Sequence, residues 1–444
     1  MKRAAWVVAG LFTIIGVLLL LRMGNVEPTV AGGEAAQLST PDMPIFETDP
    51  TWPKIPNNWQ LGLVSDVFVD PQNHVWVLHR FRQVTDEQKR KGPAAPPVLE
   101  FDTEGNFIQA WGGPNDSYDW PATEHGISVD QKGFVWLGGS GNGDHYILKL
   151  TRDGKFVMQI GQKGQSQGNS DTKNVNRAAD VMMYPKTNEV FVGDGYGNRR
   201  VIVFDADSGA FKRMWGAFGN PPTDPAPGER VSGEDIRQMF RLREEGMSDD
   251  DIVKAMKREI GTVRELLVLA EEGRRGPDQL IEAHSARVSN DGFVYVCDGP
   301  AKRVQVFTID GKFVDQVFIN RGTRALSTAT GTVVERPRNE VEDELYKHHE
   351  TSGRAALSTD PEQRFLYVTD RSTQQIVVLD RKSLKVLGTI GDGPGRAPGQ
   401  FFVVHGLAVD AQGNLYTAEV HAAGNRRAQK LTFKGLRSVS APSE

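Results

Sequence analysis

The chain is built from short apolar runs separated by polar turns, and this pattern recurs from about residue 60 to residue 435. The runs are rich in Val, Leu, Ile, Phe and Tyr and are bounded by Gly, Asn and Asp, which is typical of β-strands joined by tight turns. The runs near the start of each unit are apolar at consecutive positions, as expected of strands packed on both faces. This pattern predicts an all-β fold.

The apolar runs group into similar units with a period of about 40–50 residues. A unit contains a leading strand, Asp-x-x-Gly, an aromatic-rich strand, a further apolar strand, Asp-Gly and an outer strand. The copies lie at 66–112, 126–161, 190–216, 284–319, 355–391 and 405–434. Six units of four strands predict a six-bladed β-propeller. A parallel β-helix would need shorter repeats, and an α/β fold would need helices between the strands throughout.

One region between the third and fourth units, at 229–280, departs from the strand pattern. Ser232 and Ser248 are each followed three residues later by an aspartate, which is a helix-start signal. Apolar residues then recur at helical spacing over 252–256 and 263–270. We predict a helical insertion that either covers an edge of the propeller or forms a lid over one face. A second insertion, 320–350, is polar and is expected to be irregular.

The N-terminus carries an uncharged apolar stretch, Ala4 to Leu21, directly after Met-Lys-Arg. Its 18 residues are near the lower limit for a helix that spans a bilayer, and no clear Ala-x-Ala cleavage site follows. We predict a membrane anchor that keeps the N-terminus inside and the propeller in the periplasm or outside the cell. The predicted domains are the anchor at 1–23, an extended linker at 24–58, the propeller at 59–437 and a tail at 438–444.

Composition sets limits on the class of protein. The chain has 444 residues, 39% hydrophobic and 25% charged, which suits a globular body with a sizeable core. The formal net charge is −5 and no block of Lys and Arg stands out, so nucleic acid is not expected as a partner. The single cysteine, Cys297, lies inside an apolar run and is expected to be a buried strand residue rather than a nucleophile.

Three histidines occupy the same position in every second unit, namely His125, His284 and His405. A glycine follows each of them eight residues later, and a strand-like run comes next. The units between them carry small residues at that position, namely Ser65, Ala179 and Ala355. In a ring of six blades, this alternation places three imidazoles about 120° apart around one axis.

Three histidines that converge in this way form a set that holds catalytic zinc and leaves a fourth position open. Any one of them alone is more simply read as a hydrogen-bonded structural residue, but chance does not readily place three in one register. We therefore predict a zinc site. Five other histidines do not share the register and are expected to be solvated or to lie behind the ligands; they are His79, His145, His348, His349 and His421.

Two further positions are candidates for chemistry. Tyr196 lies in the Asp-Gly-Tyr-Gly-Asn-Arg-Arg run of the third unit, which is either a plain inter-strand turn or a turn that carries the tyrosine to the channel mouth. Beside a metal dication, a tyrosine hydroxyl can have its pKa lowered and act as a general base. Arg80, after the second strand of the first unit, is either a surface residue or a fork for a substrate carboxylate.

These residues resemble those of the peptidyl-α-hydroxyglycine α-amidating lyase family, which belongs to the NHL-repeat propellers. The resemblance rests on the Asp-Gly-Tyr run with the Trp-Gly that follows, the His-Gly-x-x-x-Asp units and the His-Arg pair of the first unit. It implies zinc held by the three histidines, a catalytic Tyr196 and a substrate-binding Arg80. The implied reaction splits a C-terminal α-hydroxyglycine into a peptide amide and glyoxylate, with zinc on the hydroxyl oxygen and Tyr196 removing a proton.

The chain departs from that family at several positions. Gly299 follows Asp298 of the fourth unit, where the family has a second substrate arginine, and Arg371 lies in the fifth unit instead. Val403 replaces a methionine two residues before the third histidine. Gly406 replaces an aspartate that binds a structural calcium, and the family's disulfides are absent. The metal and the fold are therefore expected to be retained more fully than the substrate.

Two functions remain open from the sequence. The first is an exported, zinc-dependent carbon–nitrogen lyase that acts on a small peptide-like substrate. The second is a non-catalytic NHL-repeat propeller that binds a protein or glycan of the cell envelope, and Gly299 favours it. A different metal-dependent hydrolase would need carboxylate ligands in the channel, and the matched positions carry none.

Overall fold

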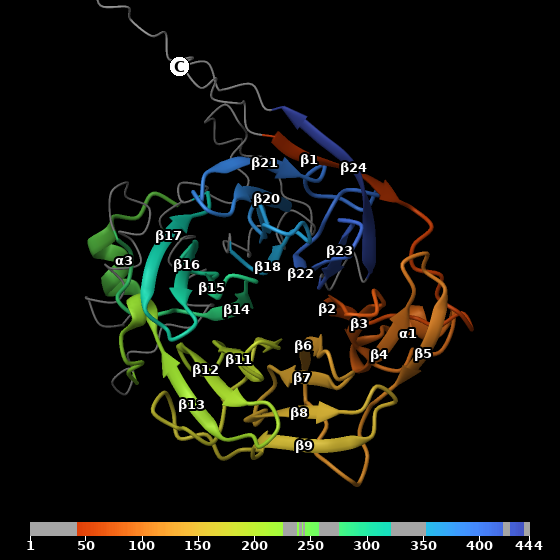
Figure 1. Cartoon of the computed structure of the whole chain (residues 1–444), viewed down its shortest axis with the longest axis horizontal. Helices are drawn as coiled ribbons and strands as arrows, with labels where there is room; N and C mark the ends of the chain where they lie inside the picture. The colour runs from red at the N-terminus through yellow and green to blue at the C-terminus, as the bar shows by residue number, and fades with distance from the viewer. Residues whose placement is uncertain are drawn as a thin grey trace, which may run out of the picture. The chain divides into compact units, whose positions relative to one another are not determined.

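The computed structural model describes residues 42–224, 245–256, 275–320, 352–420 and 427–438, with the single positions 238 and 242. Over these residues the chain forms six four-stranded antiparallel sheets, which stand as blades around a central axis (Figure 1). The six-bladed β-propeller predicted from the repeats is therefore confirmed. In five of the blades, consecutive strands follow one another from the axis to the rim.

The strands of these five blades have the following bounds. The first blade contains β2 (Leu63–Val69), β3 (Val75–Arg80), β4 (Val98–Phe101) and β5 (Phe107–Trp111). The second contains β6 (Glu124–Val129), β7 (Val135–Gly139), β8 (Tyr146–Leu150) and β9 (Phe156–Gly161). The third contains β10 (Asp180–Tyr184), β11 (Glu189–Asp194), β12 (Arg200–Asp205) and β13 (Phe211–Trp215). The fourth contains β14 (Ala283–Val288), β15 (Phe293–Asp298), β16 (Arg303–Thr308) and β17 (Phe313–Phe318). The fifth contains β18 (Ala355–Leu357), β19 (Phe365–Asp370), β20 (Gln375–Asp380) and β21 (Val386–Ile390).

The sixth blade closes the ring with strands from both ends of the described chain. It contains β22 (Val404–Val409), β23 (Leu415–Glu419), β24 (Ala428–Ser438) and, outermost, β1 (Asp42–Asp49). β1 and β24 are antiparallel, with Asp42 opposite Ser438 and Asp49 opposite Lys430. The sequence pattern places 42–49 in the linker 24–58, and the structure corrects this boundary, because these residues complete the hydrogen-bonded ladder of the last blade.

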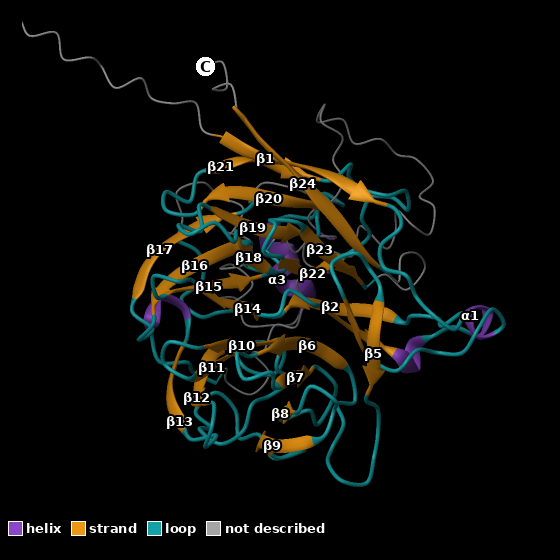
Figure 2. Cartoon of the chain, turned by 45° about the vertical axis from the view of Figure 1, so that its right-hand side comes forward, coloured by secondary structure: helices purple, strands orange, loops and turns teal. Residues whose placement is uncertain are grey.

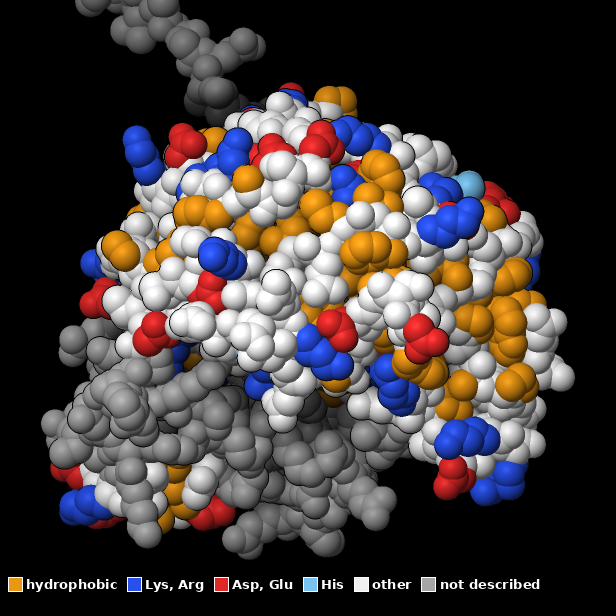
Figure 3. Space-filling model, turned by 90° about the horizontal axis from the view of Figure 1, so that it is seen from below, with side chains coloured by type: hydrophobic (Ala, Val, Ile, Leu, Met, Phe, Trp, Pro, Cys, Tyr) orange, Lys and Arg blue, Asp and Glu red, His pale blue; other side chains and the backbone are white. Residues whose placement is uncertain are grey.

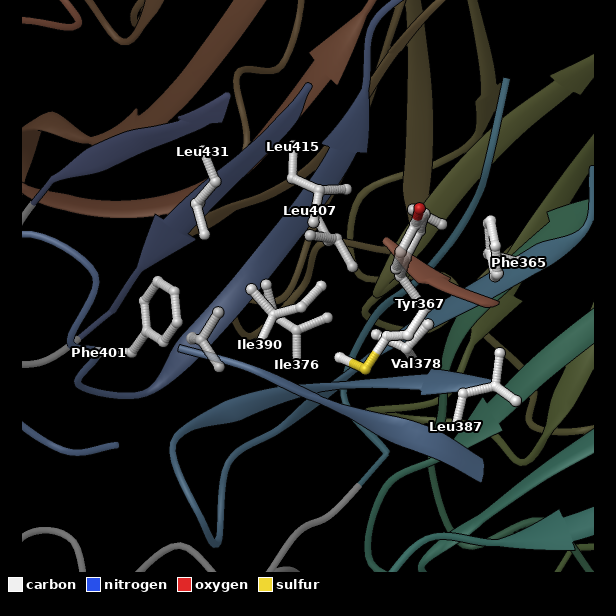
Figure 4. Close-up of a cluster of buried hydrophobic side chains, with 13 residues drawn as sticks. Phe365, Tyr367, Ile376, Val378, Leu387, Ile390, Phe401, Leu407, Leu415 and Leu431 are labelled. Carbon is white, nitrogen blue, oxygen red and sulfur yellow. The ribbon is translucent and has the colours of Figure 1, made fainter. Parts of the chain in front are cut away.

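The hydrophobic core lies between neighbouring blades. Figure 4 shows one such cluster, in which Tyr367 and Val378 of the fifth blade lie with Leu407 and Leu415 of the sixth. Further clusters of this kind fill the other contacts between blades. Each fully buried side chain of this type contributes about 1.5–3 kcal/mol. Packing of blade on blade therefore provides the rigid ring that carries the axial residues.

Among the described residues, most of the exposed large apolar side chains lie on the outermost strands. Among them are Phe156 of β9, Phe211 of β13 and Val314 of β17. On the face shown in Figure 3, apolar side chains are interspersed with charged ones. This distribution is ordinary for a water-exposed surface, since much of any protein surface is apolar.

Helices are few in the described part of the chain. α1 (Asp86–Lys89) lies on a loop that projects from the side of the propeller (Figure 2). α3 (Asp249–Met256) lies within the predicted insertion 229–280, and it buries Ile252. The predicted helix at 263–270 and nearly all of the insertion 320–350 lie outside the described residues. None of the helices described could span a membrane, and the predicted anchor at 1–23 lies outside the described residues.

Candidate metal centre

The three repeat histidines lie on the innermost strands of alternate blades. His125 is on β6, His284 on β14 and His405 on β22. In each strand the pairing with the second strand shifts across the histidine, which is therefore the extra residue of a β-bulge. A bulge bends the strand and re-aims the side chain of the extra residue. The bulge allows all three imidazoles to point to the axis. The pattern of apolar residues along the sequence does not predict this bulge.

The three rings meet at the axis of the propeller. Their centroids are 4.7 Å apart for His125 and His405, 4.8 Å for His284 and His405, and 5.2 Å for His125 and His284. One ligand nitrogen of each histidine lies within 4.8 Å of the others, and all three residues are buried. The structure thus brings together the residues that the sequence predicts as metal ligands.

A main-chain carbonyl of the next blade holds the outer nitrogen of each imidazole. The Nδ1 atoms lie 2.7 Å from the oxygen of Ala179 for His125, 2.7 Å from that of Gly353 for His284, and 2.6 Å from that of Ser65 for His405. Because a carbonyl oxygen can only accept, each Nδ1 carries the proton and donates it. Each Nε2 is then an unprotonated lone pair, the state in which an imidazole binds a metal.

The blades between the histidines supply these carbonyls. Ser65 and Ala179 are two of the small residues that alternate with the histidines, and they let the backbone come close to the imidazoles. In the fifth blade the residue whose carbonyl contacts the histidine is Gly353 and not Ala355, as the contact with His284 shows. The register predicted for that unit is corrected by two residues. The sequence misled because this unit lacks the aspartate that follows the small residue in the first and third units.

Burial lowers the pKa of all three imidazoles well below the usual value for histidine. Loss of hydration is the largest cause in each, followed by the charge of Arg80 at His125 and of Arg371 at His284. Neutral imidazoles are therefore favoured at neutral pH, and protons compete little for Nε2. Three neutral nitrogen donors, each oriented by a second hydrogen bond, fit a zinc ion that keeps one position open.

A buried ion pair sets the conformation of the loop that carries Tyr196. Asp194, the last residue of β11, accepts a hydrogen bond from Nε of Arg200 at 2.9 Å, and both side chains are fully buried. A Cβ on Gly195 would lie 2.5 Å from a main-chain nitrogen of the fourth blade. A Cβ on Gly197 would lie 2.0 Å from a side-chain oxygen of the preceding loop. The two glycines beside Tyr196 are therefore required for this loop to pack so closely.

The hydroxyl of Tyr196 lies between two of the histidines. Its oxygen is 2.9 Å from Nε2 of His125 and 3.1 Å from Nε2 of His284. A hydroxyl has one proton, so it can donate to only one of these two lone pairs. Three Nε2 lone pairs and the oxygen of Tyr196 thus lie close together, and they share one hydroxyl proton, which is too few to give every acceptor a hydrogen bond. A cation satisfies such a set better than hydrogen bonds do, because buried polar atoms need partners.

Arg80, the last residue of β3, lies at the same end of the channel. Its Nε donates to the carbonyl oxygen of Glu124, the residue before His125, at 3.1 Å. Burial lowers the pKa of Arg80, and its electrostatic interaction with Tyr196 acts in the opposite direction. The guanidinium is therefore within electrostatic reach of the Tyr196 hydroxyl. The structure brings Arg80, Tyr196 and the histidines into one site.

Arg371 lies beside the triad, although its sequence position did not place it there. It follows β19 and is buried, and its Nε would be 3.1 Å from a Cβ on Gly353, whose carbonyl orients His284. After burial, its charge is the largest cause of the lowered pKa of His284. Gly299, in the turn after β15, has no side chain to contribute. Arg371 of the fifth blade therefore stands near the histidines, whereas position 299 of the fourth blade offers no side chain.

A charged layer occupies the next residue along the inner strands. Asp66 follows Ser65, Asp180 follows Ala179 and Arg354 follows Gly353, and the three charged side chains are fully buried. The guanidinium of Arg354 lies 2.9 Å from Asp66 and 2.5 Å from Asp180. Arg287 of β14 also pairs with Asp180, at 2.7 Å. Two carboxylates and two guanidinium groups thus meet one layer away from the three imidazoles.

The calcium that the family resemblance implies does not fit this layer. Gly406 offers no side chain, and a Cβ there would lie 2.9 Å from Oδ1 of Asp66 and 2.8 Å from the side chain of Ala418. The positive charge beside Asp66 and Asp180 already comes from Arg354 and, at Asp180, also from Arg287. The chain therefore supplies its own cation at this level of the channel.

Two other residues singled out in the sequence are structural. His79 is fully buried; its Nδ1 accepts from the Gly62 amide at 3.0 Å, and its Nε2 lies 3.0 Å from the Pro96 oxygen. It is therefore neither solvated nor behind a ligand, which corrects the expectation for it. Burial raises the pKa of the Cys297 thiol to about 12, as suits a buried strand residue. His348, His349 and His421 lie outside the described residues.

The fold and the site define a six-bladed β-propeller with an axial three-histidine centre, and its homologues include amidating enzymes. The "Peptidylglycine alpha-amidating monooxygenase" of Rattus norvegicus is 30% identical over 179 residues, covering 38% of this chain and 18% of that protein. A "Probable peptidyl-alpha-hydroxyglycine alpha-amidating lyase" of Caenorhabditis elegans is 26% identical over 158 residues, covering 33% of this chain and 42% of that protein.

Other homologues carry a structural name only. The "NHL repeat-containing protein 3" of Mus musculus is 29% identical over 191 residues, covering 41% of this chain and 48% of that protein. The matches span less than half the length of each of these three relatives. No protein-family model matches the chain. The comparisons therefore support a resemblance to the lyase family and to NHL-repeat proteins.

Proposed function

We propose that the protein is a zinc-dependent lyase that cleaves a C-terminal α-hydroxyglycine into an amide and glyoxylate. The observation that carries this proposal is the hydroxyl of Tyr196 within hydrogen-bond distance of Nε2 on both His125 and His284. A proton acceptor is thereby positioned against the open side of a three-nitrogen metal site. Homologues named as amidating lyases support the same reaction class.

Each residue of the site has a distinct task in this reaction. His125, His284 and His405 would hold the zinc through Nε2, since Nδ1 is committed to a carbonyl. When bound, zinc supplies a Lewis acid that makes the substrate hydroxyl a better proton donor. Tyr196, as the ionised hydroxyl, is placed to accept that proton. The positive charge of Arg80 favours this ionised form.

The reaction needs no water or redox partner to balance. The substrate hydroxyl loses its proton, the carbonyl of glyoxylate forms, and the bond between carbon and the amide nitrogen breaks. The nitrogen then takes up a proton, which the hydroxyl of Tyr196 can return. Arg80 is placed to pair with the substrate carboxylate. The buried charge of Arg371 also acts on the triad, at His284.

The test is glyoxylate release from a peptide that ends in α-hydroxyglycine. Tyr196→Phe removes the proton acceptor and is expected to lower the rate by about 100-fold or more, the range of general-base catalysis. Tyr184→Phe is a matched control, because Tyr184 is a buried tyrosine of the same blade at the far end of β10. Equal rates for wild type and Tyr196→Phe would remove this residue from the mechanism.

A second candidate is a non-catalytic propeller that binds a protein of the cell envelope. Gly299 favours it, because the family's second substrate arginine is missing there. A homologue named only for its NHL repeats is also as similar as the amidating enzymes. In that case a partner captured in the wild-type complex would stay bound after zinc is removed with a chelator, and no glyoxylate would form.

We also propose that the propeller is exported and anchored by residues 1–23. The apolar stretch after Met-Lys-Arg supports this arrangement. Protease is added to cells whose outer layer has been made permeable while the cytoplasmic membrane stays closed. It should digest the propeller and leave a cytoplasmic marker protein undigested. Protection of both would contradict the proposed topology.

A further inference from the structure

The charged layer at the axis has a fixed relation to the three histidines. The carbonyls that orient the imidazoles belong to Ser65, Ala179 and Gly353. The very next residue after each carbonyl is a member of the charged layer, in the order Asp66, Asp180 and Arg354. Any movement of these charged residues therefore moves the peptide groups that set the direction of each Nε2.

The two carboxylates also reach the strands that carry histidines. Asp66 accepts from the amide of Ile127, two residues after His125, at 3.1 Å. Asp180 accepts from the amide of Ala286, two residues after His284, at 2.9 Å. Each aspartate thus ties a carbonyl-bearing blade to a ligand-bearing blade next to it.

The third member of the layer is a base where the other two are acids. Arg354 lies 2.9 Å from Asp66 and 2.5 Å from Asp180, so that its guanidinium joins the first, third and fifth blades across the axis. These are the three blades that supply the carbonyls. A third aspartate at this position would repel the other two, whereas the guanidinium of Arg354 pairs with both of them, and Arg287 of β14 brings a second positive charge to Asp180 at 2.7 Å.

We propose that Arg354 is a positioning residue for the metal centre, which it sets by locking the three carbonyl-bearing blades in register at the axis. This inference rests on the proposed zinc site. It assigns the alternate blades a task of their own: they carry no ligand, but they fix the orientation of every ligand. Residues that hold metal ligands in this way typically change metal affinity by about 10–100-fold when altered.

A buried arginine away from the axis provides the matched control. Arg381 is 3% exposed and pairs with Asp291 at 2.9 Å, so that it links the fifth blade to the fourth at the strand-end opposite the site. Its side chain is nearly covered, although less completely than that of Arg354, and it also joins two blades. Arg381→Met should therefore lower the melting temperature without altering the metal centre.

The experiment compares wild type, Arg354→Met, Arg354→Lys and Arg381→Met. Zinc affinity is measured by competition with a chromophoric chelator, and the visible absorption of the cobalt-loaded proteins reports the ligand geometry. Arg354→Met should weaken zinc binding by about 10-fold or more and change the cobalt spectrum. Arg354→Lys, which keeps the charge, should recover part of the affinity. Arg381→Met should keep both properties of the wild type.

The outcomes separate this inference from the proposed function. Wild type that binds no zinc would overturn the metal centre itself. Wild type that binds zinc, with Arg354→Met equally tight and spectrally unchanged, would overturn the role of Arg354 alone, as would an equal loss in Arg381→Met. Should Arg354→Met fail to fold, Asp66→Asn takes its place, because it breaks one ion pair and is expected to weaken zinc binding in the same direction.

Discussion

Two groups of three metal-binding side chains lie in the described part of the chain, and they differ in what stands between them. The first is the axial triad of His125, His284 and His405, and the second is Asp70, His74 and Glu100 in the first blade. In both groups the ligand atoms lie within 4.8 Å of one another. In the second group, however, a guanidinium already occupies the centre.

That guanidinium belongs to Arg152, at the turn between β8 and β9 of the neighbouring blade. It lies 2.7 Å from Asp70 and 2.9 Å from Nδ1 of His74, and it contacts Glu100 as well. The two carboxylates there are fully buried, so they need a positive charge. Proximity of donors therefore does not make a metal site. The axial triad differs because its lone pairs are directed inward and no side-chain cation lies among them in the described structure.

The largest expected effect is loss of zinc from the axial group. His284→Ala removes one of three ligands and should weaken zinc binding by more than about 100-fold, beyond the range for residues that only support ligands. His74→Ala is the control, because it removes a histidine from the cluster that Arg152 already fills. Metal content after dialysis measures both. Zinc retained by His284→Ala, or lost from His74→Ala, would contradict the assignment of the zinc site to the axial triad.

A second prediction concerns a histidine that has both nitrogens bonded. Burial lowers the pKa of His79 from 6.5 to about 4. The unfolded chain therefore binds the proton first as the pH falls, and the contribution of His79 is complete above pH 6.5 and is lost between pH 6.5 and about 4. By linkage this loss amounts to about 3 kcal/mol of the free energy of unfolding.

Urea unfolding of the zinc-free protein at pH 7 and pH 4.5 measures most of this loss. His79→Asn should show a smaller fall in stability over this interval than wild type. A fall of equal size in both proteins would show that His79 accepts a proton as readily in the fold as in the unfolded chain.

The smallest effect is expected at the acidic cluster. Arg152→Ala leaves Asp70 and Glu100 without their guanidinium and should lower the free energy of unfolding by about 1–3 kcal/mol. The loss is moderate because the Arg152 side chain is 31% exposed and water can replace part of its interaction. The variant also frees three donors, so that added zinc should restore part of the lost stability. An absence of any zinc effect in Arg152→Ala would show that the cluster lacks a metal geometry altogether.

The sequence predicted those features that repeat locally. Six copies of one strand pattern define the propeller, and the matched positions of His125, His284 and His405 define the triad, because blade geometry converts a period along the chain into an angle around an axis. Tyr196 could be predicted as a site residue for a similar reason, since the glycines on both sides of it mark a turn that packs closely on another blade.

The sequence could not predict features that depend on pairing between distant segments. β1 belongs to the sixth blade, but Asp42-Met-Pro-Ile-Phe-Glu-Thr-Asp49 carries a weak strand pattern with a proline that suits only an edge strand. The fifth blade has Arg354 where its register predicts an aspartate, so Ala355 was aligned in place of Gly353. Arg371 was not predicted as a site residue, because it is far from the histidines along the chain and only the folding of the blades brings it beside them.

The central claim is that three imidazoles hold one zinc ion at the axis. Crystals of the purified propeller measured on both sides of the zinc absorption edge test it directly. The account predicts one anomalous peak at about 2.0–2.1 Å from Nε2 of His125, His284 and His405. A zinc-replete protein with no peak at the axis, or with its peak at Asp70, His74 and Glu100, would contradict it.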